Sequence, residues 1–171
     1  IAKICRMPKP VIAAINGVAA GGGFSLSLAC DLTVAAESAK FVTAYSDIAA
    51  SPDLEMTYFL PRLIGSKKAF ELALVKKLLT AQEAKEWGIV NQVVPDEKLK
   101  ETARELALQL VNDPSLAIGS TKKLLGLSLS QALESQMENE TELIARAGAT
   151  QDFREGVTAF IQRQSSELKG L

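Results

Sequence analysis

Histidine is absent from this chain of 171 residues, and its absence excludes several kinds of site. Histidine is the usual general base near neutral pH and the commonest zinc ligand in proteins. A Ser-His-Asp triad therefore cannot be drawn from this chain alone. Any acid–base chemistry must come from carboxylates, tyrosine, lysine or backbone amides.

Cysteine is scarce as well: Cys5 and Cys30 are the two examples, and they lack CxxC spacing. A disulfide framework or a cysteine-rich metal site needs more thiols than this, in a closer pattern. We expect two reduced, partly buried thiols and a reducing compartment such as the cytoplasm. We expect no bound metal.

The chain also lacks a strong charge of either sign, because 19 Lys and Arg residues stand against 20 Asp and Glu residues. Nucleic-acid binding depends on a basic face that neutralises phosphates, so we expect no nucleic-acid partner. The segment 11–30 carries no charge, but it contains Asn16, four glycines and two serines. It is less apolar than a typical membrane span, and we expect no membrane association.

Apolar and β-branched runs concentrate before Val94, whereas the carboxyl half has helical periodicity, so the sequence predicts an α/β protein. Strands are expected at 11–15, 32–35, 40–42 and 89–94, the first of them central in a parallel sheet. Helices are expected at 24–30, 53–64, 67–79, 97–111, 115–127, 131–147 and 153–164. Thr80 with Glu83, and Ser128 with Gln131, have the spacing of capping boxes, and Gly88 is placed to end the helix that Thr80 starts.

The triplet Gly21-Gly22-Gly23 at a predicted helix start is the first feature that can carry chemistry. Glycines let a ligand approach the backbone, and the N–H groups of a first helical turn favour negative charge. The phosphate-binding patterns GxxxxGK[ST] and GxGxxG are absent. The triplet is thus either a site for the oxygen of a polarised carbonyl or a device for close helix packing.

Asp53 is the second feature, because it follows Ser51-Pro52 in an uncharged neighbourhood at a loop-to-helix junction. The simplest interpretation of such an acid is a helix cap or a first-turn residue. Tyr45 and Asp47 have similarly plain interpretations: a half-buried aromatic with a satisfied hydroxyl, and a solvated acid.

Residues 9–23, KPVIAAINGVAAGGG, and the following Cys30-Asp31 strongly resemble the signature of the crotonase superfamily, also called enoyl-CoA hydratase/isomerase. Further matches occur at 39–41, 60–65, 79–84, 87–90, 94–95 and 154–160. The resemblance implies a spiral of ββα units over residues 1–110 and a helical carboxyl-terminal trimerisation region over 111–171, with the amino-terminal part of the fold absent. It also implies acyl-CoA substrates, a homotrimer or a dimer of trimers, and a location in the cytoplasm, or in the mitochondrial or peroxisomal matrix of a eukaryote. No separate cofactor is implied, because coenzyme A is part of the substrate.

In this family two backbone N–H groups bind the thioester oxygen, and the resemblance places one of them at Gly22. The other lies in a portion that precedes Ile1 in relatives. The resemblance also implies substrate contacts at Ala20, Gly21, Gly22, Phe24, Ser25 and Pro52. Phe160 and Arg163 resemble residues of a helix that touches coenzyme A.

Departures from the family pattern point to the reaction. Ser25 and Tyr45 stand where hydratases keep glutamates, which disfavours a simple hydratase. Asp53 matches the acid of several isomerases, including ring-opening epoxyphenylacetyl-CoA isomerases, and we expect it to be the base, with Gly22 and Tyr45 completing the catalytic set. The alternatives are a hydratase, another lyase, a dehalogenase with a nucleophilic aspartate, or a non-catalytic acyl-CoA-binding relative.

Overall fold

The computed structural model describes residues 1–111, 113–165 and 168. Their contacts divide the chain into two compact units. The first comprises Ile1–Cys5 and Val11–Ala107, and the second comprises Arg6–Pro10 and Leu108–Leu171.

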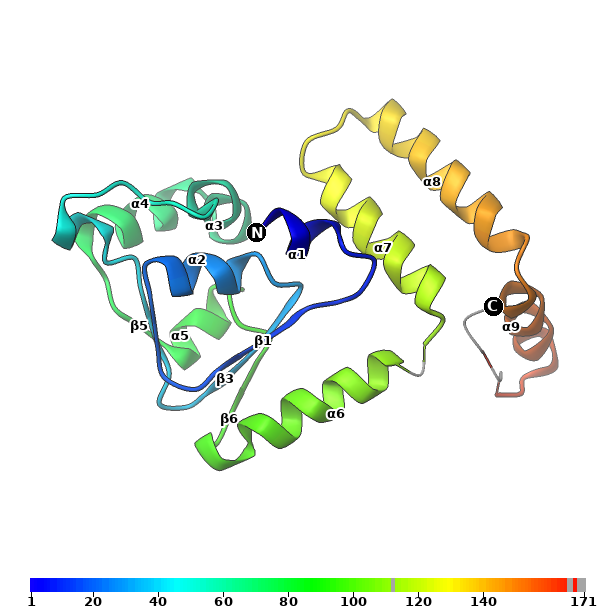
Figure 1. Cartoon of the computed structure of the whole chain (residues 1–171), viewed down its shortest axis with the longest axis horizontal. Helices are drawn as coiled ribbons and strands as arrows, with labels where there is room; N and C mark the ends of the chain where they lie inside the picture. The colour runs from blue at the N-terminus through cyan, green and yellow to red at the C-terminus, as the bar shows by residue number, and fades with distance from the viewer. Residues whose placement is uncertain (112, 166–167, 169–171) are drawn as a thin grey trace. The chain divides into compact units, whose positions relative to one another are not determined.

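Two small sheets form the frame of the first unit (Figure 1). The parallel sheet has the order β1-β3-β6, with β1 at Ile12–Ile15, β3 at Leu32–Ala36 and β6 at Gln92–Val94. The second sheet has the order β2-β4-β5, with β2 at Val18–Ala20, β4 at Lys40–Val42 and β5 at Leu79–Thr80. The pairs β1-β2 and β3-β4 each place one strand in either sheet and are followed by a helix, as in a ββα unit, whereas β5 joins the same sheet as β4 and is separated from β6 by a helix.

Helices lie before, between and after these strands along the chain. The short helices are α1 (Ala2–Arg6), α2 (Gly22–Leu28), α5 (Ala81–Glu86) and the 3₁₀ turns η1 (Tyr45–Ile48) and η2 (Asp96–Lys98). The longer ones are α3 (Met56–Ile64), α4 (Ser66–Val75) and α6 (Leu99–Val111). The expected capping box of α5 is confirmed, because Thr80 Oγ1 accepts from Glu83 N and the Glu83 carboxylate accepts from Thr80 N.

The main core contains side chains of both sheets and of the helices, and in it Phe24 of α2 packs against Phe41 of β4 with ring centroids 5.5 Å apart. A smaller core contains Val34 and Ala36, whereas Ala35 between them belongs to the main core. Successive side chains of a strand point to opposite faces. Strand β3 is therefore buried on both faces and is the central strand of its sheet.

The expectation of a central first strand is thus wrong. Among the described residues β1 pairs only with β3, and its side chains are half-buried or exposed. Its apolar β-branched composition predicted a strand correctly but could not reveal how many neighbours it has. Strand β2 was not predicted, because three residues between two glycine-containing turns are too few to show a period.

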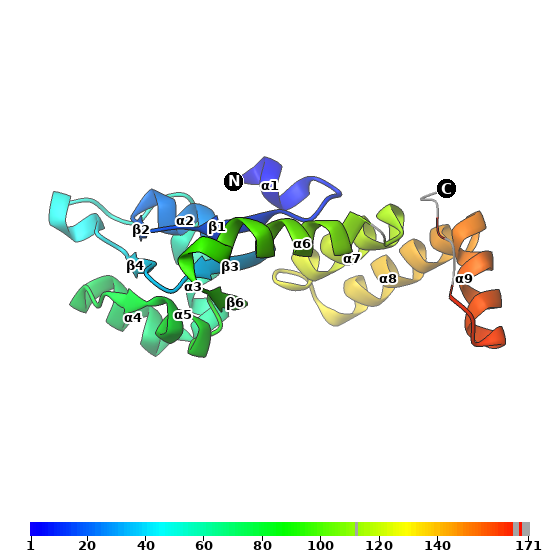
Figure 2. The same ribbon diagram turned by 90° about the horizontal axis from the view of Figure 1, so that it is seen from below.

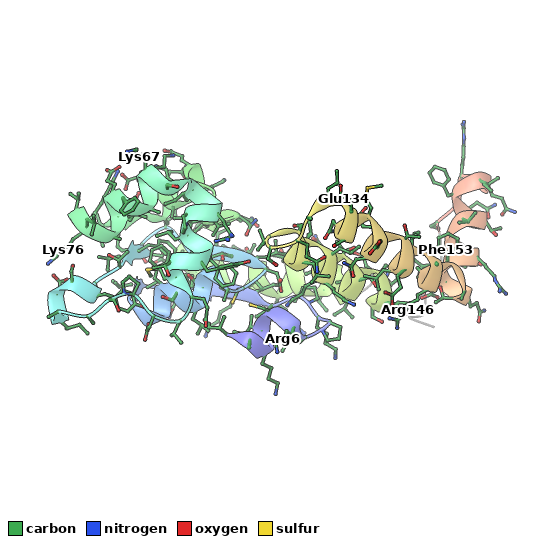
Figure 3. All side chains as sticks on the ribbon, turned by 90° about the horizontal axis from the view of Figure 1, so that it is seen from above. Arg6, Lys67, Lys76, Glu134, Arg146 and Phe153 are labelled. Atoms are coloured by element: carbon green, nitrogen blue, oxygen red, sulfur yellow. The ribbon has the colours of Figure 1, made fainter. Side chains whose placement is uncertain are left out.

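The second unit contains α7 (Ser115–Ser128), α8 (Leu133–Gly148) and α9 (Gln151–Gln162), which follow one another in Figure 2. A Cβ atom at Gly119 of α7 would lie 2.9 Å from the Pro8 carbonyl oxygen, so only glycine allows this close approach. Charged side chains such as Lys67 of α4 in the first unit and Glu134 of α8 are exposed on their helices (Figure 3).

Two further expectations need correction. The capping box of Ser128 with Gln131 does not form, because α7 continues to Ser128, whose hydroxyl donates to Leu125 O at 2.7 Å. Helix α8 begins later, with Ala132 as its N-cap. The thiol of Cys5 is free, as expected, but exposed rather than partly buried.

Candidate functional site

The glycine triplet forms a tight turn between β2 and α2. Gly21 has φ 49° and ψ −120°, a conformation that favours glycine, and its N–H donates to Val42 O at 3.1 Å. Helix α2 begins at Gly22, so the Gly22 N–H belongs to the first turn, whose N–H groups have no intrahelical acceptor. The fully buried Phe24 anchors this helix start in the core.

Asp53 and Tyr45, eight residues apart, are joined directly: the Tyr45 hydroxyl donates to Asp53 Oδ1 at 2.6 Å. The same hydroxyl lies 2.8 Å from Ser25 Oγ of α2. Ser25 is fully buried and Tyr45 nearly so, whereas Asp53 is exposed. The structure thus brings together Ser25, Tyr45 and Asp53 as one hydrogen-bonded chain.

The same chain reaches the glycine turn. The ring of Tyr45 lies against Gly21, at 3.8 Å from the position of a Cβ atom there, and Ser25 Oγ is 3.2 Å from Gly21 O. Leu54, the neighbour of Asp53, approaches Gly22 in the same way, at 3.2 Å from the position of a Cβ atom. The first turn of α2 and the acid therefore lie at one place on the first unit.

A strained segment holds Asp53 there. Ala44, Ala49, Leu54 and Glu55 all have φ between 49° and 59°, in the left-handed region that non-glycine residues seldom occupy. Such residues cost of order 1–3 kcal/mol each and gather at functional sites. Asp53 itself precedes α3, whose N-cap is Glu55, so Asp53 is not the cap that the simplest interpretation predicted.

Burial raises the pKa of Tyr45 above its usual 10.0, and its hydrogen bond to the Asp53 carboxylate raises it further, outweighing the opposite effect of Ser25. A raised pKa keeps the phenol protonated at neutral pH. Tyr45 is therefore a hydrogen-bond donor to Asp53 under ordinary conditions. Asp47, by contrast, forms an exposed ion pair with Lys76, which agrees with the solvated acid expected from the sequence.

The sequence did not predict an apolar cavity of about 200 Å³ between α3 and α4, lined in part by Pro52. Pro52 precedes Asp53, so the cavity adjoins the segment that carries the acid. Its remaining lining residues are Met56, Thr57, Leu60, Pro61, Ser66, Ala69, Phe70 and Ala73. Their spacing on the two helices was visible in the sequence, but how closely the helices pack was not.

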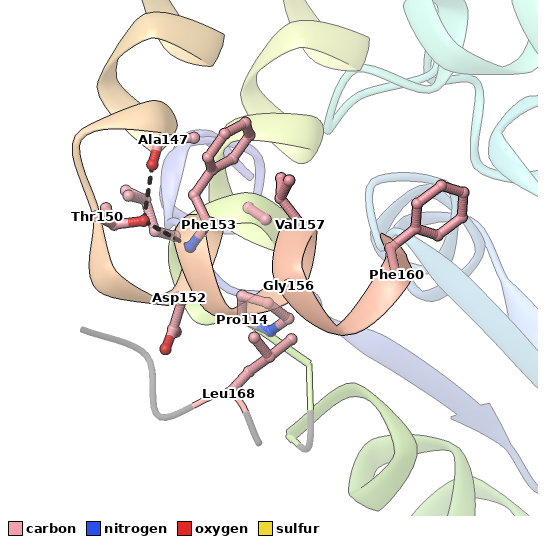
Figure 4. A pocket seen from close by; sticks show the side chains of 11 residues that line it. Pro114, Ala147, Thr150, Asp152, Phe153, Gly156, Val157, Phe160 and Leu168 are labelled. Atoms are coloured by element: carbon pink, nitrogen blue, oxygen red, sulfur yellow. Dashed lines mark hydrogen bonds between the residues drawn. The ribbon is translucent and has the colours of Figure 1, made fainter. Parts of the chain in front are cut away.

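Two of the expected substrate contacts lie in the second unit. Phe160 is on α9 and Arg163 is the C-cap residue of that helix. Phe160 is 84% exposed and borders an apolar cleft of about 320 Å³ formed by residues of α7, α8 and α9 (Figure 4). Thr150 fixes the start of α9, because its hydroxyl accepts from Phe153 N.

Within the described parts of the chain, no group of three or more His, Cys, Asp or Glu residues is arranged to hold a metal ion. In the same residues, no helix is both long enough and apolar enough to cross a membrane.

Comparison with known proteins gives a consistent result. The sequence profile of the enoyl-CoA hydratase/isomerase family matches residues 1–170. The 1,2-epoxyphenylacetyl-CoA isomerase of Escherichia coli K12 is 41% identical over 170 residues, which cover 99% of this chain and 65% of that protein. The 4-chlorobenzoyl coenzyme A dehalogenase-1 of an Arthrobacter species is 35% identical over 161 residues, covering 94% of this chain and 58% of that protein.

Solved structures agree with the sequence relatives. The enoyl-CoA hydratase of Bacillus anthracis superposes with a TM-score of 0.93 at 38% identity, covering 99% of this chain and 66% of that one. The chain spans about 65% of the length of the Escherichia coli isomerase. Isomerase, hydratase and dehalogenase all occur among the similar proteins.

Proposed function

Because the chain belongs to the enoyl-CoA hydratase/isomerase family, we propose that the protein is an acyl-CoA isomerase. It shifts a double bond by moving a proton between two carbons of the acyl group. Asp53 removes the proton and returns it, and the Gly22 N–H stabilises the thioester enolate formed in between.

The observation that carries this proposal is the hydrogen bond from Tyr45 to Asp53 Oδ1 at 2.6 Å. It occupies one oxygen of the carboxylate and orients the exposed side chain, which leaves the other oxygen to face a substrate. A single oriented carboxylate suffices for a 1,3 proton shift, because the proton that is removed is the proton that is returned.

Hydration of a double bond makes a different demand, since a water molecule must be held and activated. At the two positions where the hydratases of this family keep glutamates, this chain has Ser25 and Tyr45, and both hydroxyls are engaged within the chain of hydrogen bonds. Neither is a carboxylate that could take a proton from water. This supports isomerase over hydratase.

The substrate is proposed to be an acyl-CoA, with Ala20, Gly21, Phe24, Ser25 and Pro52 near the acyl group. The apolar cavity beside Pro52 offers about 200 Å³ for part of an acyl chain or an aromatic ring. Phe160 and Arg163 are proposed to contact coenzyme A, and no separate cofactor takes part. We also propose a cytoplasmic protein.

Assembly into a trimer is part of the same proposal. Several large apolar side chains of α8 and α9 are more than half exposed, namely Leu133, Met137, Ile144, Phe160 and Ile161. Exposed apolar surface of this kind is typical of an interface. A helical region over 111–171 that contacts a second copy accounts for it.

Isotope labelling separates the isomerase from its alternatives. The protein is incubated with 3-hexenoyl-CoA in H₂¹⁸O, and the products are analysed by mass spectrometry. An isomerase yields the conjugated 2-hexenoyl-CoA without ¹⁸O. The incubation is repeated with 2-hexenoyl-CoA: formation of a 3-hydroxyacyl-CoA carrying ¹⁸O, with 3-hexenoyl-CoA left unchanged by the protein, would move the assignment to a hydratase. Single-turnover reaction of 4-chlorobenzoyl-CoA in the same water tests the dehalogenase, because a nucleophilic aspartate transfers its own oxygen first.

A further inference from the structure

Ser25 has one hydroxyl proton and two acceptors within reach. Its Oγ lies 2.8 Å from the Tyr45 hydroxyl oxygen and 3.2 Å from Gly21 O. Ser25 is fully buried, so protein atoms rather than bulk water decide where this proton points. The two acceptors compete for it.

The protonation state of Asp53 decides the competition. A carboxylate can only accept, so the Tyr45 proton points to Asp53 Oδ1, at 2.6 Å, and Ser25 must donate to Tyr45. A hydrogen bond to an ionised group is about twice as strong as a neutral one, and it makes the donating oxygen a better acceptor in turn. While Asp53 is charged, the Ser25 proton is therefore held by Tyr45.

Once Asp53 has taken a proton, it is a neutral acid and a weaker acceptor. The Tyr45 oxygen then attracts the Ser25 proton less strongly, and the share of that proton on Gly21 O increases. No proton travels along the chain in this step: the substrate proton stays on Asp53, and only the Ser25 O–H bond turns.

Gly21 C=O and Gly22 N–H belong to the same peptide group. A hydrogen bond received by the carbonyl oxygen draws electrons towards it and makes the N–H a stronger donor, because hydrogen bonds in a chain polarise one another. Gly22 N–H is the donor assigned above to the enolate oxygen. It is strongest while Asp53 holds the substrate proton, which is the interval in which the enolate exists.

We propose that Ser25 and Tyr45 couple the protonation of Asp53 to the strength of the Gly22 oxyanion donor. This inference rests on the proposed roles of Asp53 and Gly22 and adds Ser25 as a positioning residue. It also gives a physical reason for hydroxyls at two positions where other members of the family carry glutamates: two carboxylates there could not form a neutral chain that responds to Asp53.

The test uses a bound thioester as a probe of donor strength. Phenylacetyl-CoA labelled with ¹³C at the thioester carbonyl has acidic α protons but no double bond to shift. Its carbonyl stretching frequency falls as the hydrogen bond to its oxygen strengthens. Infrared difference spectra are recorded for the wild type, Asp53→Asn, Ser25→Ala and the double variant, because the amide introduced by Asp53→Asn mimics the neutral acid.

We expect Asp53→Asn to lower the carbonyl frequency relative to the wild type and Ser25→Ala to remove most of that lowering in the double variant. Asp53→Asn also removes a negative charge, which changes the carbonyl frequency directly. Comparing Ser25→Ala with the double variant measures this direct effect, so that it can be subtracted. We also expect Ser25→Ala to slow deuterium exchange at the α carbon about tenfold, the loss typical of one neutral hydrogen bond.

Ser27→Ala is the matched control. Ser27 is also a buried serine of α2, but its hydroxyl donates to Phe24 O at 2.7 Å, away from Tyr45 and Asp53. Ser27→Ala alone should keep the wild-type exchange rate. When it is combined with Asp53→Asn, the carbonyl frequency should fall as far as it does in Asp53→Asn alone. This control separates the proposed coupling from the loss of a buried hydroxyl as such.

If Asp53→Asn lowers the frequency equally with and without Ser25→Ala, the coupling is overturned while the proposed function stays intact. Failure of the proposed function has a different signature. In that case Asp53→Asn keeps wild-type exchange, or the bound carbonyl absorbs at the same frequency as free phenylacetyl-CoA.

Discussion

The Gly22 N–H can be removed with little else changed, by comparing Gly22→Pro with Gly22→Ala. Gly22 is the first residue of α2, a position where proline is well tolerated, and it does not have a positive φ. Both substitutions place a Cβ atom 3.2 Å from Leu54 Cδ1. Only proline also removes the N–H group.

The structure sets the size of the two effects. The contact with Leu54 is tight, but Leu54 is 43% exposed and its methyl group lies at the end of a flexible side chain. A shift of a few tenths of an ångström relieves it, so Gly22→Ala should change the free energy of unfolding by less than about 1 kcal/mol. Loss of one oxyanion donor typically costs about 10²–10³ in turnover, or about 2.7–4 kcal/mol.

The assay is isomerisation of 3-hexenoyl-CoA, with urea denaturation of each variant to verify its fold. We expect the turnover of Gly22→Ala to stay within about threefold of the wild type and the turnover of Gly22→Pro to fall by about 10²–10³. Wild-type turnover in the folded Gly22→Pro variant would refute the role of the Gly22 N–H. Equal loss in both variants would show that the Cβ atom, rather than the missing donor, is responsible.

Three further predictions concern stability and assembly. Because the pKa of Tyr45 is raised in the folded state, its contribution to stability is present below about pH 10 and is lost as the pH rises further. Tyr45→Phe should therefore lose less stability at alkaline pH than the wild type, and identical pH profiles of unfolding for the two proteins would contradict this prediction. Thr80→Ala should lower the free energy of unfolding by about 1 kcal/mol, and in a carboxyl NMR titration the depressed pKa of Glu83 should move up towards its usual value; an unmoved Glu83 would show that the Thr80 hydroxyl does not contribute. Ile161→Glu, at a site 73% exposed in the single chain, should convert a trimer to monomers in sedimentation, whereas a wild type that is monomeric at micromolar concentration would rule out the proposed interface.

Local features of the fold were predictable because their causes are local. The glycine triplet and the small apolar residues after it predicted the turn and α2, and the Thr80 to Glu83 spacing predicted a capping box that forms as expected. The box at Ser128 failed for a reason outside its own four residues. Helix α7 continues through Ser128, and the Ser128 hydroxyl donates back to Leu125 O instead of capping the next helix.

The chain of hydrogen bonds at the candidate site could not be predicted from the residues themselves. The backbone between Tyr45 and Asp53 adopts a left-handed conformation at Ala49, and Leu54, just beyond Asp53, adopts another. Alanine and leucine are not residues that signal a positive φ, as glycine or asparagine do. Resemblance to the family singled out Tyr45 and Asp53 separately, but their direct contact depends on tertiary structure.

The central claim is that Asp53 is the base, and proton exchange tests it most directly. Wild-type protein and Asp53→Asn are incubated with phenylacetyl-CoA in D₂O, and deuterium at the α carbon is followed by NMR, with binding of the same ligand measured by calorimetry. Asparagine keeps the size of the side chain and can still accept the hydrogen bond from Tyr45, but it cannot take a proton. We predict that Asp53→Asn binds phenylacetyl-CoA within about threefold of the wild type and loses exchange by at least about 10²-fold, the lower range for a general base. Exchange at the wild-type rate in the folded Asp53→Asn variant would contradict the account.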